Sequence, residues 1–203
     1  MHGEIELALR EYSLDKLTRE LLVNQLDEIQ RLTKIVDGLA LLAKADAGQR
    51  EMKWGSVRLD ELVRESFADA QILAQPQKIS VTLTACDEIT MRGDRNRLRQ
   101  LLLNLTDNAI KYNHPEGRVA VSLRHNDSTA ELRIENTGVG ISREKLPRVF
   151  DRFFRGDASH SSAVEGCGLG LCIAQWIVNA HGGSIVIASE PNVLTTVMVK
   201  LSC

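Results

Sequence analysis

Long hydrophobic runs are missing from this sequence of 203 residues. No apolar stretch approaches the roughly 20 residues of a membrane span, and the first residues lack the basic start and apolar core of a secretory signal. Charge of one sign is missing too, because 25 basic and 27 acidic residues nearly cancel. No basic run favours nucleic acid or an anionic membrane surface. We therefore expect a cytoplasmic piece of protein with no nucleic-acid partner.

Cysteine is scarce, and its spacing excludes a common use. The four cysteines, Cys86, Cys167, Cys172 and Cys203, form no CxxC pair. Scattered cysteines in a cytoplasmic protein favour reduced packing residues over a disulfide frame or a metal site.

Proline is absent from a long helical pattern near the start, between Leu14 and about Ala47, where Gly38 is the only glycine. We expect a shorter helix before it, from Glu4 to Glu11, and a helix cap at Ser13. Two apolar seams follow the long helix: one contains Leu14, Leu17, Leu21, Leu32, Ile35, Leu39 and Leu42, and the other Leu22, Leu26, Ile29 and Val36. Two seams are more apolar surface than one helix can leave in water. The segment between Leu14 and Ala45 is therefore expected to form a helical bundle with a second copy of the chain, with upstream sequence, or with both.

The pattern changes near residue 50, which predicts a helical domain over residues 1–50 and a second domain over 51–203, with the junction at about residues 48–55. The second domain mixes helices and strands and is expected to be α+β, with helices on one face of one mainly antiparallel sheet. Asp60 and Gly93-Asp94 are expected to cap helices. The expected strands are residues 57–59, 79–83, 89–92, 118–124, 130–135, 184–188 and 195–201, and the expected last helix is 169–180.

A polar stripe with selected chemistry lies on the central helix of this domain. Its members, Asn104, Asn108, Lys111 and Tyr112, share one face at i, i+4, i+7 and i+8, while Leu101, Leu102, Leu105 and Ala109 turn to the core. Asn108 offers an oxygen to a divalent cation, Lys111 an ammonium to phosphate, and Tyr112 a ring to a flat heterocycle. The alternative is a solvated polar face of an amphipathic helix.

Two glycine clusters favour the nucleotide interpretation. In the first, Gly138 and Gly140 directly follow a predicted strand and Asn136. In the second, Gly166, Gly168 and Gly170 precede a helix whose first amides attract phosphate. The second cluster is neither a dinucleotide-binding fingerprint nor a P-loop, because it ends in Leu171 and lacks GKS or GKT.

The ordered set of four motifs, residues 104–112, 136–140, 150–155 and 166–171, resembles the N, G1, F and G2 boxes of sensor histidine kinases of the GHKL ATPase superfamily. The long helix that ends in AKADAG resembles the second helix of that family's dimerisation and phosphoacceptor domain. The resemblance implies a two-layer α/β sandwich of the Bergerat type, a homodimer, and a response-regulator receiver domain as partner. It also implies a full-length protein in the inner or plasma membrane, with this piece attached only through upstream segments.

The resemblance also implies roles for individual residues. It implies ATP and Mg2+ as cofactors, with Mg2+ on Asn108. It implies a mobile lid over residues 150–166 and amides from the second glycine cluster on phosphate. The implied cofactor-binding residues are Asn104, Asn108, Lys111, Tyr112, Asn136, Gly138, Gly140, Arg155, Gly166, Gly168, Leu169, Gly170, Leu171 and Thr196, with Thr195 as the neighbour that could replace Thr196.

Two departures from the family pattern stand out. Asn136 occupies the adenine-reading position where the family has Asp, so a hydrogen bond to the adenine amino group loses charge assistance, about 1 kcal/mol. The family's phosphoacceptor is a His followed by an acidic residue, and no histidine here has that neighbour. His160 imitates the motif but lies in the expected lid. We therefore expect the chain to begin after the acceptor and not to autophosphorylate.

The residue one turn before Asn108 separates this family from related ATPases. GHKL hydrolases and anti-sigma kinases carry a Glu base one turn before the metal-binding Asn, where this chain has Asn104. An amide cannot accept a proton near neutral pH, which disfavours a water-activating ATPase. The alternative that stays open is a non-catalytic module for nucleotide binding and dimerisation.

Overall fold

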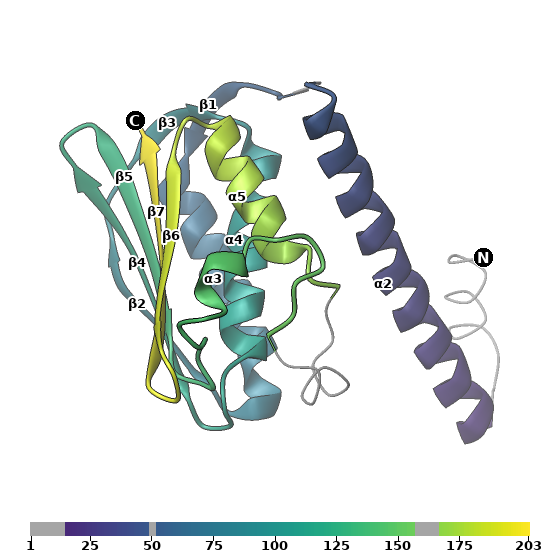
Figure 1. Cartoon of the computed structure of the whole chain (residues 1–203). Helices are drawn as coiled ribbons and strands as arrows, with labels where there is room; N and C mark the ends of the chain where they lie inside the picture. Colours follow the sequence, from purple (N-terminus) through teal and green to yellow (C-terminus); the bar gives the residue numbers. More distant parts are fainter. Residues whose placement is uncertain (1–14, 49–51, 157–166) are drawn as a thin grey trace. The chain divides into compact units, whose positions relative to one another are not determined.

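The structure, a computed structural model, describes residues 15–48, 52–156 and 167–203 (Figure 1). The chain divides into two compact units, residues 1–49 and 50–203. The expected helix from Glu4 to Glu11 and the expected cap Ser13 lie outside the described residues.

Helix α2 (Lys16–Asp46) forms the described part of the first unit. Its cap is Asp15, which accepts hydrogen bonds from Thr18 N–H at 3.0 Å and from Thr18 Oγ1 at 2.6 Å. The helix ends as predicted. Ala47 is the C-cap residue of α2. Gly48 follows with φ +73°, a left-handed conformation that glycine adopts at low cost.

A five-stranded sheet forms one layer of the second unit. Its order is β2 (Ser80–Cys86), β4 (Arg118–Asn126), β5 (Thr129–Asn136), β7 (Leu194–Ser202) and β6 (Ser184–Glu190). β2 and β4 pair in parallel, and the other neighbours pair antiparallel. The predicted β4–β5 hairpin is confirmed, with the turn at Asp127 in the left-handed region at φ +51°.

The expectation of one sheet is wrong in one respect. β1 (Gly55–Arg58) and β3 (Thr90–Gly93) form a separate antiparallel pair, with Val57 opposite Met91. Gly55 therefore belongs to a strand of the second unit, and the junction does not extend to it. The physical reason is that strand partners are chosen by tertiary packing, which the local pattern of residues 57–59 and 89–92 does not encode.

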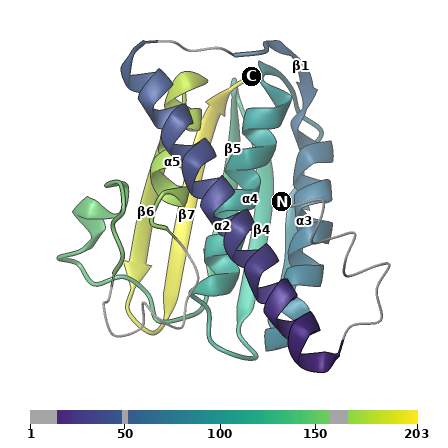
Figure 2. The ribbon, with the colours of Figure 1, turned by 90° about the vertical axis from the view of Figure 1, so that its right-hand side faces the viewer.

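Three helices cover one face of the five-stranded sheet: α3 (Leu59–Ala74), α4 (Arg95–Lys111) and α5 (Gly170–Ala180) (Figure 2). Short 3-10 turns occupy Gln75–Gln77 and Leu146–Arg148. The core contains the inward side chains of alternate strand positions, such as Val119, Val121 and Leu123. The two-layer α+β prediction is confirmed.

Asp60 does not cap α3, contrary to the prediction. Arg58 occupies the cap position without a side-chain hydrogen bond, and Asp60 is the second helical residue. The Asp60 carboxylate is buried and accepts from Arg58 Nε at 3.0 Å and Arg58 Nη2 at 2.8 Å. This ion pair occupies both carboxylate oxygens, so the side chain turns back towards Arg58.

In the described part of the chain, no helix is both long enough and apolar enough to cross a membrane.

Candidate functional site

Helix α4 presents the predicted polar stripe. Asp94 caps it as expected, and Leu101, Leu102, Leu105 and Ala109 are buried as predicted. Tyr112 is the residue at which α4 ends, so its backbone departs from helical geometry, and 40% of Tyr112 is exposed. The stripe therefore runs from Asn104 to the end of the helix.

Asn104 and Asn108 lie against the beginning of α5. Asn104 Nδ2 donates to the Gly170 carbonyl at 3.2 Å. A Cβ placed on Gly170 would lie 3.8 Å from Asn108 Nδ2 and 3.9 Å from Asn108 Oδ1. The structure thus brings the N box and the second glycine cluster together.

Among the described residues, none caps the beginning of α5 with its side chain. Leu169 stands at the cap position without a capping hydrogen bond, and its side chain is buried. The first N–H groups of a helix have no partner inside the helix, and together with the helix dipole they favour an anion. Gly170 and Leu171 thus present backbone donors next to the Asn108 amide.

Lys111 is engaged with a neighbour on its own helix. Its Nζ lies 2.6 Å from Asp107 Oδ2, one turn earlier. Both side chains are partly exposed, so this pair is weak and can exchange for a phosphate.

The first glycine loop packs on the end of α4. Gly138 has φ +142°, and a Cβ there would overlap the Tyr112 carbonyl oxygen. Val139 N–H lies 3.4 Å from the same oxygen. Glycine at residue 138 thus permits close backbone approach between the loop and α4.

Gly140 likewise permits close backbone approach between the first glycine loop and the β6–β7 turn. It has φ +67°, and a Cβ would come within 2.7 Å of Pro191 Cα. Asn192 N–H donates to Val139 O at 3.1 Å, and Asn192 itself has φ +58°. Asn is among the non-glycine residues that tolerate this region best.

Asn136 and Thr195 face each other across β5 and β7, on the face that the helices cover. Both residues are buried. Thr195 Oγ1 lies 2.7 Å from Ser189 Oγ, which accepts from Ile141 N–H at 2.9 Å. This chain of hydrogen bonds ties the first glycine loop to β6 and β7.

Thr196 lies on the opposite face of the sheet. Its Oγ1 donates to Glu135 Oε1 at 3.2 Å. Successive side chains of a strand point to opposite faces, so Thr195 and Thr196 cannot both approach Asn136. The structure does not bring Thr196 next to Asn136, and Thr195 lies there instead.

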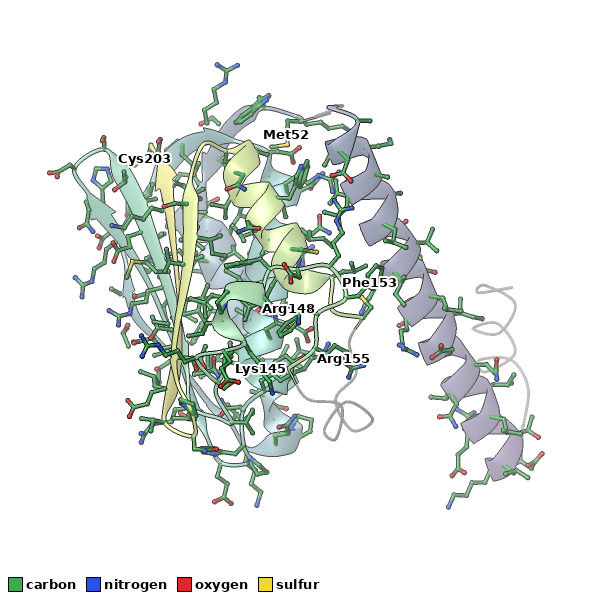
Figure 3. The ribbon with its side chains drawn as sticks, in the orientation of Figure 1. Met52, Lys145, Arg148, Phe153, Arg155 and Cys203 are labelled. Atoms are coloured by element: carbon green, nitrogen blue, oxygen red, sulfur yellow. The ribbon has the colours of Figure 1, made fainter. Side chains whose placement is uncertain are left out.

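The F-box segment contacts the second glycine cluster through its backbone. Gly168 has φ +69°, and a Cβ there would lie 2.7 Å from Phe153 C. Phe153 N–H donates to Gly168 O at 3.0 Å. Figure 3 labels Phe153 and half-buried Arg155 on this segment. Gly166, His160 and most of the expected lid lie outside the described residues.

Asn113 and Thr137 are structural members of the site that the sequence reasoning missed. Asn113 Oδ1 accepts from Thr137 Oγ1 at 2.8 Å, and Asn113 Nδ2 donates to Arg118 O at 3.1 Å. They join the end of α4 to β4 and the first glycine loop. Their signal in the sequence was position alone, because each directly follows a predicted site residue.

The cysteines are free, as expected. Cys172 lies in the first turn of α5, where burial raises the pKa of its thiol. Its Sγ donates to Leu169 O at 3.1 Å, which is a packing role.

The fold and the grouped motifs define an ATPase domain of the GHKL type, and comparison with known proteins agrees. Residues 93–203 match the family described as histidine kinase-, DNA gyrase B-, and HSP90-like ATPase. The chain belongs to this family.

Within that family the similarity is to sensor histidine kinases. The chain is 35% identical over 187 residues to the sensor protein SrrB of Staphylococcus aureus, a match that covers 90% of this chain and 31% of SrrB. It is 32% identical to the mycobacterial sensor histidine kinase MprB, with a TM-score of 0.65 over 73% of this chain and 97% of that one.

Full-length ShkA, whose structure holds AMPPNP, is 22% identical with a TM-score of 0.81, over 98% of this chain and 42% of ShkA, and this likeness shows the fold alone. The chain spans about a third of the length of SrrB, one of the curated relatives that it matches.

Proposed function

We propose that this chain binds Mg-ATP and acts as the kinase core of a two-component sensor histidine kinase. The observation that carries the proposal is the uncapped beginning of α5 beside the amides of Asn104 and Asn108. A preformed set of backbone donors next to neutral side-chain amides suits a phosphate chain accompanied by a cation.

The residues fit both cofactors. The Asn108 side chain makes no hydrogen bond to the described residues, so its oxygen is available to Mg2+. A bound Mg2+ would neutralise phosphate charge during the transfer. Gly168, Leu169 and Gly170 would give amides to phosphate, Lys111 would leave Asp107 for the phosphates, and Arg155 would approach them from the F box. Asn136, Thr195, Gly138 and Gly140 would form the adenine end, with Tyr112 beside the base.

The proposed reaction is transfer of the γ-phosphoryl group to an imidazole nitrogen. The N–P bond forms as the bond from γ-phosphorus to the bridging oxygen breaks, and ADP leaves with that oxygen. This chain contributes positioning and charge stabilisation. No histidine here has the acidic neighbour that would activate it, so the acceptor is supplied on another polypeptide or on another part of the full-length protein. A response-regulator receiver domain would then take the phosphoryl group.

Dimerisation through α2 belongs to the same proposal. Leu17, Leu21, Leu32 and Val36 are more than half exposed on this helix. Such a row needs a partner, and a second copy of the chain supplies an identical one.

Calorimetric titration with ATP, with and without Mg2+, tests the binding. Asn108→Asp should weaken ATP binding at least tenfold, on the order of 1.4 kcal/mol or more, because it places a negatively charged carboxylate near the negatively charged phosphates. Gly168→Ala should weaken it as strongly, because a Cβ meets the Phe153 backbone. Asn179→Asp, the same chemical change at an exposed position of α5, is the matched control. A folded wild type that binds no ATP at millimolar concentration contradicts the proposal.

A transfer assay separates the kinase from the alternative, a non-catalytic nucleotide-binding module. Incubation with γ-labelled ATP should leave this chain unlabelled and should label an added acceptor domain in an acid-labile form. An unlabelled acceptor, with ATP binding intact, would favour the module. Acid-labile label on this chain, lost in His160→Ala, would identify His160 as an acceptor after all.

A further inference from the structure

The segment that enters the second unit is fastened at three points outside the proposed nucleotide site. Lys53 N–H donates to Asp94 Oδ2 at 2.8 Å. The Trp54 ring packs edge-on against the His181 ring, with centroids 5.3 Å apart. β1 then pairs with β3, with Gly55 opposite Gly93. We call Lys53, Trp54, Asp94 and His181 the linker anchor.

Asp94 joins this segment to α4. Its Oδ1 accepts from Asn96 N–H at 3.0 Å and from Arg97 N–H at 3.1 Å, which caps the helix. Burial alone would raise the pKa of Asp94, but the hydrogen bonds from Lys53, Arg97 and Asn96 outweigh it and leave the pKa below its ordinary value. The carboxylate is therefore charged at neutral pH, with one oxygen on the helix and the other on the entering segment.

His181 joins the same point to α5. It follows the last residue of that helix and is 8% exposed. Its Nδ1 lies 2.8 Å from Ile177 O, and a carbonyl can only accept, so Nδ1 carries the proton. Its Nε2 accepts from Asp94 N–H at 3.0 Å. Both ring nitrogens are used, and together they tie the end of α5 to the start of α4.

On both helices, the groups proposed to bind nucleotide lie away from the linker anchor. Asn104 lies ten residues after Asp94, about 15 Å along α4 at 1.5 Å per residue. α5 begins at Gly170, beside Asn108, and ends next to His181 after 11 residues, about 16 Å. Figure 3 shows Met52, just before the anchor, towards one end of α5 and Phe153 towards the other.

We propose that the linker anchor is a positioning site that couples the entering segment to nucleotide binding. When residues 53 and 54 are docked, they hold the far ends of α4 and α5, and these helices then present Asn104, Asn108 and the α5 amides at their correct separation. The inference rests on the proposed binding of Mg-ATP. A packed helix passes a displacement of one end to the other, and linkage requires bound nucleotide to tighten the anchor in return.

A matched pair of variants in the full 203-residue chain tests the coupling. Lys53→Pro removes the N–H that Asp94 accepts, whereas Lys53→Ala keeps that N–H and removes only the side chain. Titration with Mg-ADP should show a Kd raised on the order of fivefold or more in Lys53→Pro, and changed by less than about twofold in Lys53→Ala.

Asp94→Asn provides a second route to the same result. Asn is a good helix cap, so α4 keeps its start, but the amide turns an NH2 group towards Lys53 N–H. It should raise the Kd for Mg-ADP as Lys53→Pro does. This variant keeps the inference testable if proline disturbs folding.

A reciprocal measurement distinguishes coupling from a purely structural role. The chain has two tryptophans, so Trp176→Phe leaves Trp54 as the only one. Addition of Mg-ADP should then shift Trp54 emission, and Lys53→Pro should abolish the shift. If wild type binds Mg-ADP while folded anchor variants bind equally well, or Trp54 emission does not respond, the inference is overturned. If wild type binds no nucleotide, the proposed function itself fails.

Discussion

At the scale of single residues, the side chain of Asn136 is held by its own neighbour in the chain. Asn136 Nδ2 donates to Thr137 O at 2.7 Å, a contact that only the NH2 end of the amide can make with a carbonyl oxygen. The orientation of the amide is thereby determined, and its other atom, Oδ1, is the acceptor left for a ligand. A neutral acceptor suits the amino group of adenine and repels the carbonyl oxygen of guanine.

Asn136→Asp is therefore expected not to improve ATP binding, although it restores the family's usual residue. The carboxylate would gain charge assistance of about 1 kcal/mol towards adenine, but its second oxygen would face Thr137 O without a donor, which costs about 1 to 3 kcal/mol. Calorimetry should give a Kd for ATP equal to or higher than that of wild type. Asn126→Asp, at the exposed end of β4, controls for the added charge. A clearly lower Kd for Asn136→Asp would show that the contact with Thr137 O does not favour the amide over a carboxylate.

The choice between Thr195 and Thr196 shows where sequence reasoning reached its limit at this scale. The sequence left Thr195 and Thr196 both open. Which of them faces Asn136 depends on the register of β7 against β5, in which Thr195 lies opposite Asn136. A signal was available within the strand, because Val197, Val199 and Leu201 share the spacing of Thr195 and are buried. His181 gave no such signal, since its partner Asp94 lies 87 residues earlier.

At the scale of elements, the Arg58–Asp60 pair joins the end of β1 to the first turn of α3. Arg58 holds the Asp60 carboxylate through two hydrogen bonds, and Ile89 N–H lies 3.4 Å from Asp60 Oδ1. The hydrogen bonds from Arg58 lower the pKa of Asp60, and they outweigh burial, which would raise it.

This lowered pKa predicts a pH dependence of stability. A carboxylate whose pKa is lower in the folded state stabilises the fold above its unfolded pKa of about 3.9, and the stabilisation is lost as pH falls through the folded pKa. Asp60→Asn should lower the free energy of unfolding at pH 7, and the difference from wild type should shrink below about pH 4. Urea unfolding at several pH values measures it, with Asp69→Asn on the exposed Arg99 pair as control. A difference that stays constant down to pH 3 contradicts this account.

Elements were predicted well where local chemistry decides them. The cap of α4, the β4–β5 hairpin and the glycine end of α2 follow from residues adjacent in the chain. The separate β1–β3 pair and the parallel β2–β4 pair could not be predicted, because strand partners are chosen by tertiary packing rather than by local pattern.

At the scale of the whole molecule, α2 leaves apolar side chains in water along a helix of 31 residues, about 46 Å long. Leu17 and Leu21 lie one turn apart near its start, and Leu32 and Val36 one turn apart near its middle, each more than half exposed. Two copies that align these rows would bury them together, as the expectation of a homodimer requires.

Leu32→Glu combined with Val36→Glu should dissociate that dimer without unfolding α2, since Glu is a strong helix former. Burying one Leu or Val contributes about 1.5 to 3 kcal/mol, so two substitutions on each of two chains should raise the dimer Kd at least about a hundredfold. Sedimentation velocity over a concentration series measures the Kd, and Gln30→Glu adds the same charge per site at an exposed polar position of the same helix. A wild-type chain that is monomeric at high micromolar concentration, with the α2 amides protected from exchange, would contradict the prediction, because a helix with these exposed rows would then be stable alone.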